Sequence, residues 1–286
     1  MEYNFEDDIK AIREIMELSQ DQLADILEVE RVTVSRTELN KTVASSRFIE
    51  KVYAYAFSND IRINKLKEML WSEKMKPGHK LLFHGAKSEI NGRIRADIGR
   101  EQNDFGQGFY AGESYDQSIS YVSNYKESSV YLMDFQAKGL KCREYSVDRD
   151  WMLTVAYFRG GLNEYENHPY VRKLAKDARD SDYIIAPIAD NRMFKIIDSF
   201  IGGEITEEQC KHCLAATNLG KQYVFLTEKS VSKLKIVDRC YISDNERKSY
   251  LDLRTQESKL GDDKVKLARI QYRGKGKYID EIIGDL

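Results

Sequence analysis

At 286 residues, with 42% hydrophobic and 32% charged residues, the chain has the size and composition of an ordinary soluble protein with one large domain or two modest ones. Its net charge of −2 excludes a generally basic nucleic-acid-binding protein but permits local basic patches. No apolar run of 18 residues is present and the chain begins with an acidic segment, so we expect no membrane contact and a cytoplasmic location.

The first 76 residues predict a bundle of helices. Apolar residues recur at helical spacing over residues 9–16, which indicates a first helix. Ser19 then offers a hydroxyl cap with Gln22 three residues later, a combination that predicts the start of a second helix. After a turn at residues 28–30, a third helix is expected to hold residues 32–36.

The pattern Ser-Gln-x-x-Leu-Ala at 19–24, followed by Val-x-x-Val-Thr-Val-Ser-Arg at 29–36, resembles the phage-repressor (XRE-type) class of helix-turn-helix domains. The resemblance covers residues 5 to about 58 and departs from the class at residues 37–40. In that class the second helix of the pair enters the major groove of DNA. The resemblance therefore implies that Arg31, Thr33 and Arg36 contact operator DNA.

Charge argues against assuming that this helical region binds DNA. Residues 1–76 hold twelve Lys and Arg against fifteen Asp and Glu, and affinity for phosphates comes mainly from cations. Glu28, Glu30 and Glu38 surround the expected recognition helix. A dimerisation module or a docking site for an antitoxin protein is the alternative interpretation.

A domain boundary is predicted at Pro77-Gly78, where the helical pattern stops. We expect domains at 1–76 and 77–286, the second with a core over 80–237 and a basic extension over 238–286. Short strand-like runs alternate with helical stretches after the boundary, which favours an α+β fold with antiparallel sheets. The expected strands are 80–83, 130–135, 141–145, 183–187 and 223–227, and the expected helices include 116–123 and 207–216.

Two short segments carry the most specific chemistry. His84-Gly85 ends an apolar run, so a strand tip is expected to offer an imidazole beside an open backbone. Gly108-Phe109-Tyr110 follows a Gly-rich bend, which would deliver two flat rings to the edge of a cleft. Either segment alone is also typical of a strand end or a hairpin that binds nothing.

Together these segments resemble the first two signature segments of the ADP-ribosyltransferases, in the branch whose triad begins with His and Tyr. Within that clan, Phe-Gly-x-Gly-Phe-Tyr at 105–110 is similar to a bacterial family of unassigned function. The resemblance spans residues 80 to about 237 and implies a split antiparallel β-sandwich with flanking helices. Further similar segments are 148–152, 157–159, 182–190 and 222–229.

The resemblance implies that NAD is bound as a substrate. The Gly85 backbone would pair with the nicotinamide amide, His84 would bind the adenine-side ribose, and Tyr110 would stack on the nicotinamide with Phe109 beside it. Gln222 would occupy the third catalytic position and hold a ribose hydroxyl.

Two further residues are assigned by the resemblance. Arg159 would bind the pyrophosphate, although an Arg after aromatic residues is also commonly a surface residue. Asp190 would supply charge to the pocket, although an Asp after a strand is also commonly a turn former.

Gln222 departs from the wider clan, which usually has Glu at the third position, whereas Gln is expected in the similar bacterial family. An amide can accept a hydrogen bond but has no charge to stabilise a cationic sugar and cannot act as a general base. Glu228 is a poor substitute, because alternation along the strand predicts the same face but a separation of about 20 Å.

Two other features are weaker. Cys210 and Cys213 have the spacing of a metal knuckle, but no second pair follows, so we expect helical thiols and no metal. Residues 264–277 carry six cations and Tyr272 with no acid among them. This segment could follow a nucleic-acid backbone or form an ordinary solvated face.

These features predict an NAD-dependent mono-ADP-ribosyltransferase that modifies RNA, DNA or protein, as a bacterial toxin or phage-defence effector. Its helix-turn-helix domain would regulate or target it, through operator DNA, an antitoxin or dimer formation. The alternative is a DNA-binding regulator whose second domain only senses NAD or a related nucleotide. An interaction module with an inactive pocket is a third interpretation.

Overall fold

A computed structural model describes residues 3–217 and 220–284, which form two compact units. The first unit takes the described residues up to Asn91, with Ser114–Phe135 and Lys235–Leu253. The second takes Gly92–Glu113, Gln136–Leu234 and the described residues from Arg254 onward. The chain therefore returns to the first unit twice, and the predicted boundary at Pro77-Gly78 lies within its first segment.

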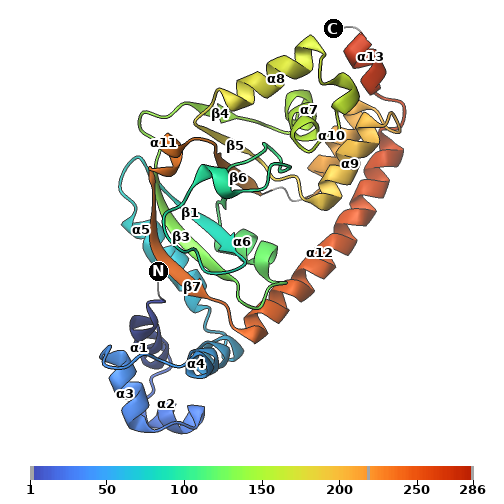
Figure 1. Cartoon of the computed structure of the whole chain (residues 1–286). Coiled ribbons are helices and arrows are strands. Elements are labelled where there is room, and N and C mark those ends of the chain that lie inside the picture. The colour runs from blue at the N-terminus through green and yellow to red at the C-terminus, as the bar shows by residue number, and fades with distance from the viewer. Residues whose placement is uncertain (1–2, 218–219, 285–286) are drawn as a thin grey trace. The chain divides into compact units, whose positions relative to one another are not determined.

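The N-terminal region is helical, as predicted, and its helices α1 to α4 are the blue ribbons in Figure 1. Ser19 begins α2 with a capping box that uses Gln22, and Glu28 ends it with a left-handed φ of 52°. Both signals are local, which explains why the sequence predicts these boundaries. The five helices are α1 (Phe5–Ile15), α2 (Gln20–Leu27), α3 (Arg31–Glu38), α4 (Ser46–Ser58) and α5 (Ile63–Lys74).

Glu38 connects α3 to α1 and α2 by hydrogen bonds. Its carboxylate accepts hydrogen bonds from Arg13 Nε at 2.6 Å and from Gln20 Nε2 at 2.8 Å. Only 5% of its side chain is exposed. The negative charge of Glu38 is therefore paired within the helical bundle.

Lys67 of α5 joins α1 to the strand β7 (Leu234–Tyr241). Its ammonium lies 2.6 Å from Asp8 and 3.4 Å from Asp238. Burial by itself would lower the pKa of Lys67, but the charge of Asp8 and its neighbours raises it. Because a buried cation needs paired anions, these residues fix the helical bundle to the rest of the first unit.

The remainder of the first unit consists of three strands, the helix α6 and the start of the helix that begins at Asp244. The strands lie in the order β1-β3-β7, and the helix α6 packs with them around buried Phe83 and Tyr115. Their bounds are β1 (His79–Ala86), α6 (Tyr115–Val122) and β3 (Ser129–Gln136). The predicted strands 80–83 and 130–135 and the predicted helix 116–123 are therefore confirmed with slightly different ends.

The second unit has four strands in the order β4-β5-β6-β2. Strand β6 pairs antiparallel with both β5 and β2, whereas β4 pairs parallel with β5. The expectation of antiparallel pairing throughout is wrong at β4, because two helices separate β4 from β5 along the chain and a crossover returns the chain in the same direction. The bounds are β2 (Phe109–Gly112), β4 (Cys142–Glu144), β5 (Tyr183–Pro187) and β6 (Lys221–Phe225).

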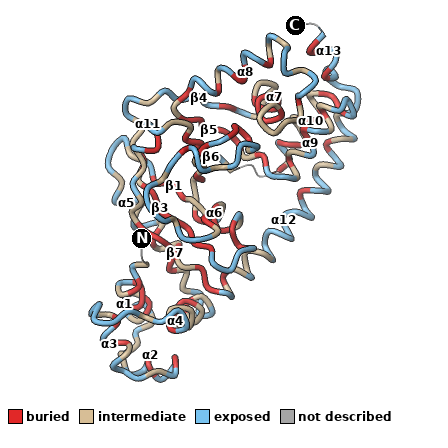
Figure 2. Tube along the Cα trace, viewed as in Figure 1, coloured by how far each residue is buried: buried red, intermediate tan, exposed pale blue. Residues whose placement is uncertain are grey.

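Helices enclose the core of the second unit. The middle residues of α7 are buried and so is most of strand β6, as Figure 2 shows. Trp151 of α7 is completely buried. Cys210 and Cys213 lie buried in α10, which confirms the predicted helical thiols. The helices are α7 (Arg149–Phe158), α8 (Pro169–Arg179), α9 (Asn191–Ile201), α10 (Glu207–Ala215), α11 (Glu228–Val231) and α13 (Ile279–Gly284), with short 3-10 turns at Ala96–Ile98 and Asn163–Tyr165.

Helix α12 (Asp244–Gln271) contains the first part of the basic segment 264–277. Tyr272, which the sequence offers for stacking on a base, instead stacks on His212 with ring centroids 3.5 Å apart. Among the described helices, none combines the length and apolar character needed to cross a bilayer.

The buried carboxyl group of Glu246 in α12 should make the stability of the protein depend on pH. It accepts hydrogen bonds from Tyr115 at 3.0 Å and from Asn64 at 3.2 Å. Burial raises the pKa of Glu246 to about 7, although both hydrogen bonds oppose the shift. A raised pKa gives stability that is full below the ordinary carboxyl pKa and is lost as pH rises through about 7.

We therefore expect wild-type protein to lose thermal stability between about pH 5 and pH 7.5, and Glu246→Gln to lose less. Melting temperatures across this range measure the difference, with the exposed Glu73→Gln as a control. Parallel pH curves for wild type and Glu246→Gln would contradict the assignment.

Candidate functional site

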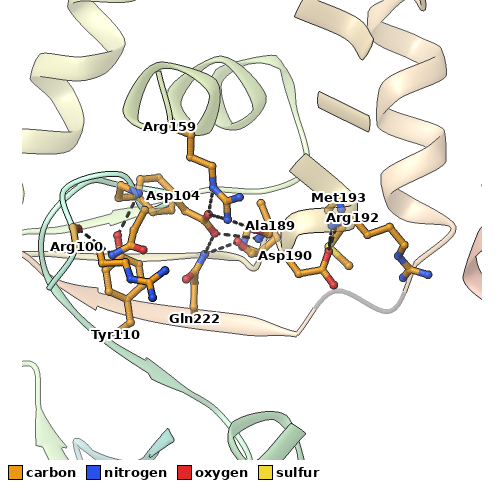
Figure 3. Close-up of polar contacts among 12 residues, drawn as sticks. Arg100, Asp104, Tyr110, Arg159, Ala189, Asp190, Arg192, Met193 and Gln222 are labelled. Carbon is orange, nitrogen blue, oxygen red and sulfur yellow. Dashed lines mark hydrogen bonds and ion pairs between the residues drawn. The ribbon is translucent and has the colours of Figure 1, made fainter. Parts of the chain in front are cut away.

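The second unit contains a polar site built around the carboxylate of Asp104 (Figure 3). Only 4% of Asp104 is exposed. Its Oδ1 accepts from Arg159 Nε at 2.8 Å and Nη2 at 2.5 Å. Its Oδ2 accepts from the backbone N–H of Ala189 at 3.0 Å and from Gln222 Nε2 at 2.7 Å. Four N–H donors, two of them on the Arg159 guanidinium, thus stabilise the charge of a carboxylate that is almost completely buried.

Gln222 lies in β6 with its amide held in one orientation. Its Nε2 donates to Asp104 and also to the carbonyl oxygen of Pro187 at 3.0 Å. Both partners are acceptors, so the nitrogen must face them and Oε1 must point elsewhere. Gln222 is 6% exposed and therefore has little freedom to reorient.

Small residues flank Gln222 on both neighbouring strands. Gly112 of β2 lies opposite it on one side, and Ala186 of β5 lies opposite it on the other. Directly opposed residues project from the same face of a sheet, so neither of the two positions directly opposite Gln222 places a large side chain against the amide.

Tyr110 lies on the same face of the sheet as Gln222. It is opposite Val224, two residues from Gln222 along β6, and such diagonal neighbours are within reach of an aromatic side chain. The Tyr110 hydroxyl donates to the carbonyl of Gly106 at 2.7 Å and accepts from the N–H of Phe105 at 3.2 Å. The preceding loop therefore fixes the ring.

Gly106 allows this loop to close. Its φ is +76°, and a Cβ there would lie 3.0 Å from the ring of Phe158. A residue with a side chain would be strained by the backbone conformation and would press on Phe158. The close packing against Phe158 and the positive φ therefore explain why the bend expected from the sequence has glycine at position 106.

Phe109 projects to the other face of the sheet. Side chains alternate along β2, and the Phe109 ring contacts Phe225, with centroids 6.4 Å apart. The sequence places Phe109 and Tyr110 together as two rings of one cleft. The structure separates them, and only Tyr110 shares a face with Gln222.

Arg159 is committed to the carboxylate of Asp104. It also donates to the carbonyl of Ala189, and its guanidinium lies 4.6 Å from the centroid of the Phe194 ring. Among the described residues, its Nη1 has no hydrogen-bond partner. The predicted pyrophosphate contact would therefore have to use Nη1.

Asp190 caps a helix. Its Oδ1 accepts from the N–H groups of Arg192 and Met193 at 2.9 Å each, at the start of α9. This geometry matches the turn-forming alternative, in which the carboxylate compensates the positive end of the helix.

The placement of Glu228 on the strand of Gln222 is wrong. Strand β6 ends at Phe225, and Thr227 caps a new helix that Glu228 begins. Glu228 accepts from the N–H of Ala96 at 3.1 Å. The hydroxyl cap stops the strand, so period-2 alternation does not extend to this residue.

His84 and Gly85 belong to β1 in the first unit, whereas Tyr110, Arg159, Asp190 and Gln222 belong to the second. At Gly85, a Cβ would lie 2.5 Å from the carbonyl oxygen of Ser118. The missing side chain thus makes room for α6, and the predicted approach of a ligand to this backbone is still a prediction.

The predicted DNA-contact residues lie on α3. Arg36 is exposed and Thr33 is half-buried. Arg31 is exposed and lies 3.3 Å from Asp21. Because Glu38 is paired with Arg13, one of the three acids that argued against DNA binding is neutralised inside the bundle.

Asp104 is the residue that sequence reasoning missed. It stands directly before the Phe-Gly-x-Gly-Phe-Tyr segment, where an Asp is most often a turn former. Its partners Arg159 and Gln222 are 55 and 118 residues away along the chain. A local sequence pattern cannot indicate contacts between residues that are this far apart along the chain.

A family model described as "Protein of unknown function (DUF3990)" matches residues 81–236, more than half of the chain. No curated protein and no solved structure matches the chain. The matched segment includes Asp104, Tyr110, Arg159 and Gln222.

We expect Asp104→Asn to destabilise the protein by about 3 kcal/mol, because it leaves the Arg159 guanidinium, which is only 16% exposed, without its charge partner. Urea unfolding monitored by Trp fluorescence measures the change. Asp97→Asn is the matched control, since Asp97 pairs with Arg95 at a position where both side chains are about half exposed. Equal midpoints for the two variants would show that the Asp104–Arg159 pair contributes nothing.

Proposed function

We propose that this chain, which belongs to the family of proteins of unknown function (DUF3990), is an NAD-dependent mono-ADP-ribosyltransferase that modifies a macromolecule. Its second unit would then be part of the split β-sandwich of that clan. The observation that carries the proposal is the placement of Tyr110 and Gln222. They lie on one face of paired strands. The amide nitrogen of Gln222 donates to Asp104 and Pro187, so the amide oxygen points away from these two acceptors.

The site fits a nucleotide sugar in three respects. The Oε1 of Gln222 is an acceptor suited to a ribose hydroxyl. Gly112 and Ala186, directly opposite Gln222, place no large side chain against the amide. The fixed ring of Tyr110 offers a flat apolar surface beside it. His84, from the sequence resemblance, stays the predicted contact for the adenine-side ribose.

NAD would supply the ADP-ribosyl group, whose bond to the nicotinamide nitrogen breaks as the electron pair returns to that ring. The acceptor then bonds to the sugar carbon and loses a proton. Gln222 orients the sugar through a hydroxyl but cannot take the proton. Catalysis would therefore depend on positioning and on an acceptor that is a good nucleophile or is activated by another group.

We expect Gln222→Ala and Tyr110→Ala each to reduce ADP-ribosyl transfer by about 100-fold, because misplacement of the reacting sugar costs this much. His84→Ala is expected to weaken NAD binding. The assay incubates the protein with labelled NAD and a bacterial lysate, then separates protein, RNA and DNA.

Gln102→Ala is the control, since Gln102 is exposed and close in sequence to Asp104. Unchanged NAD with no label in any fraction would refute the transferase. Binding of NAD without turnover would identify the sensor alternative instead.

We also propose that the N-terminal helices bind operator DNA, a second function favoured by the inward pairing of Glu38 with Arg13. This pairing removes one negative charge from the surface around α3. Arg36 stays exposed and forms no ion pair among the described residues.

In a mobility-shift assay with the sequence upstream of its own operon, Arg36→Ala should weaken binding and reduce the salt slope by about 1. The control is Lys76→Ala, which removes an exposed cation after α5. A wild-type log affinity that does not change with log salt would contradict phosphate-based binding.

A further inference from the structure

The amide of Gln222 has one favourable orientation, and Asp104 is the main reason. If the amide were flipped, Oε1 would lie against the Asp104 carboxylate and the Pro187 carbonyl, which are both acceptors. Each of these two buried acceptors would then lose one donor, and three oxygens would crowd together. The observed orientation satisfies all of them.

Asp104 is itself held rigidly. Arg159 places two N–H groups on Oδ1, which leaves Oδ2 for Ala189 and Gln222. The guanidinium is fixed in turn by the Ala189 carbonyl and the face of Phe194. Directional hydrogen bonds therefore connect Arg159 to Asp104 and Asp104 to the Gln222 amide, so the position of the guanidinium determines the orientation of the amide.

We propose that Asp104 is a positioning residue that directs the Oε1 of Gln222 toward the ligand, so that the site recognises a group that donates a hydrogen bond. The identity of that ligand as NAD, with its ribose hydroxyls, rests on the proposed function. Asp104 also explains the amide at position 222. A carboxylate there would lie one hydrogen bond from a second carboxylate.

The test is the pH dependence of Gln222→Glu. A protonated Glu side chain can donate to Asp104 as the amide does, whereas an ionised one repels it. The like charge should raise the pKa of the introduced carboxyl above its usual value. We expect near wild-type NAD affinity at about pH 5, then a loss of about tenfold per pH unit above the midpoint, because binding requires one proton.

Two further proteins make the test specific. Asp104→Asn combined with Gln222→Glu removes the like charge, so the midpoint should move down by about one pH unit or more. Gln102→Glu is the matched control, because it makes the same substitution at an exposed position. Isothermal titration with NAD at each pH measures all four proteins, with wild type and Gln102→Glu expected to show no such dependence.

Equal NAD affinity of Gln222→Glu at all pH values, or an unchanged midpoint in the double variant, would overturn the positioning role. If wild type binds no NAD, the proposed function fails, and thermal unfolding of the same proteins decides the positioning role. Relative to wild type, whose own stability falls as Glu246 titrates, Gln222→Glu should then lose additional stability as pH rises through the raised pKa of the introduced carboxyl. Loss of this additional decrease in the double variant supports the Asp104 contact, and its persistence refutes it.

Discussion

The second unit depends on one buried carboxylate. Asp104 is almost completely buried, so protein donors must stabilise its charge. Those donors come from the end of α7, the loop after β5 and strand β6, which the chain sequence keeps far apart. The same contacts that make burial tolerable also fix the relative positions of these segments, and hence the orientation of Gln222.

The first unit contains two similar arrangements, in which a buried charged residue pairs with residues of other elements. Glu38 joins α1 and α2 to α3, and Lys67 joins α1 and α5 to β7. In each case a charge of one sign lies inside the unit and its partners come from other elements. Removal of one member would leave the other charged and buried, so such pairs specify an arrangement strongly even where they add little net stability.

The chemistry of the candidate site follows from the pairing of an amide with a carboxylate. Asp104 supplies a negative charge, but Arg159 neutralises it, and Gln222 transmits orientation rather than charge. A site of this kind is suited to holding a hydroxyl-bearing ligand in one pose. Any acceleration of glycosidic cleavage would come from that placement and from exclusion of water.

The sequence by itself determined the features that arise from neighbouring residues. The capping box at Ser19, the strand at Tyr183–Pro187 and the helical position of Cys210 and Cys213 all match expectation. Period-2 alternation and capping hydrogen bonds act within a few residues, so their patterns can be recognised along the chain.

Tertiary structure decided the rest. The parallel pairing of β4 depended on which strand lies beside it, and the position of Tyr110 on the same face as Gln222 depended on the register of β2 with β6. The role of Asp104 required contacts across 55 and 118 residues. Such contacts are fixed by the burial of charge among segments that lie far apart along the chain, which a local sequence pattern does not reveal.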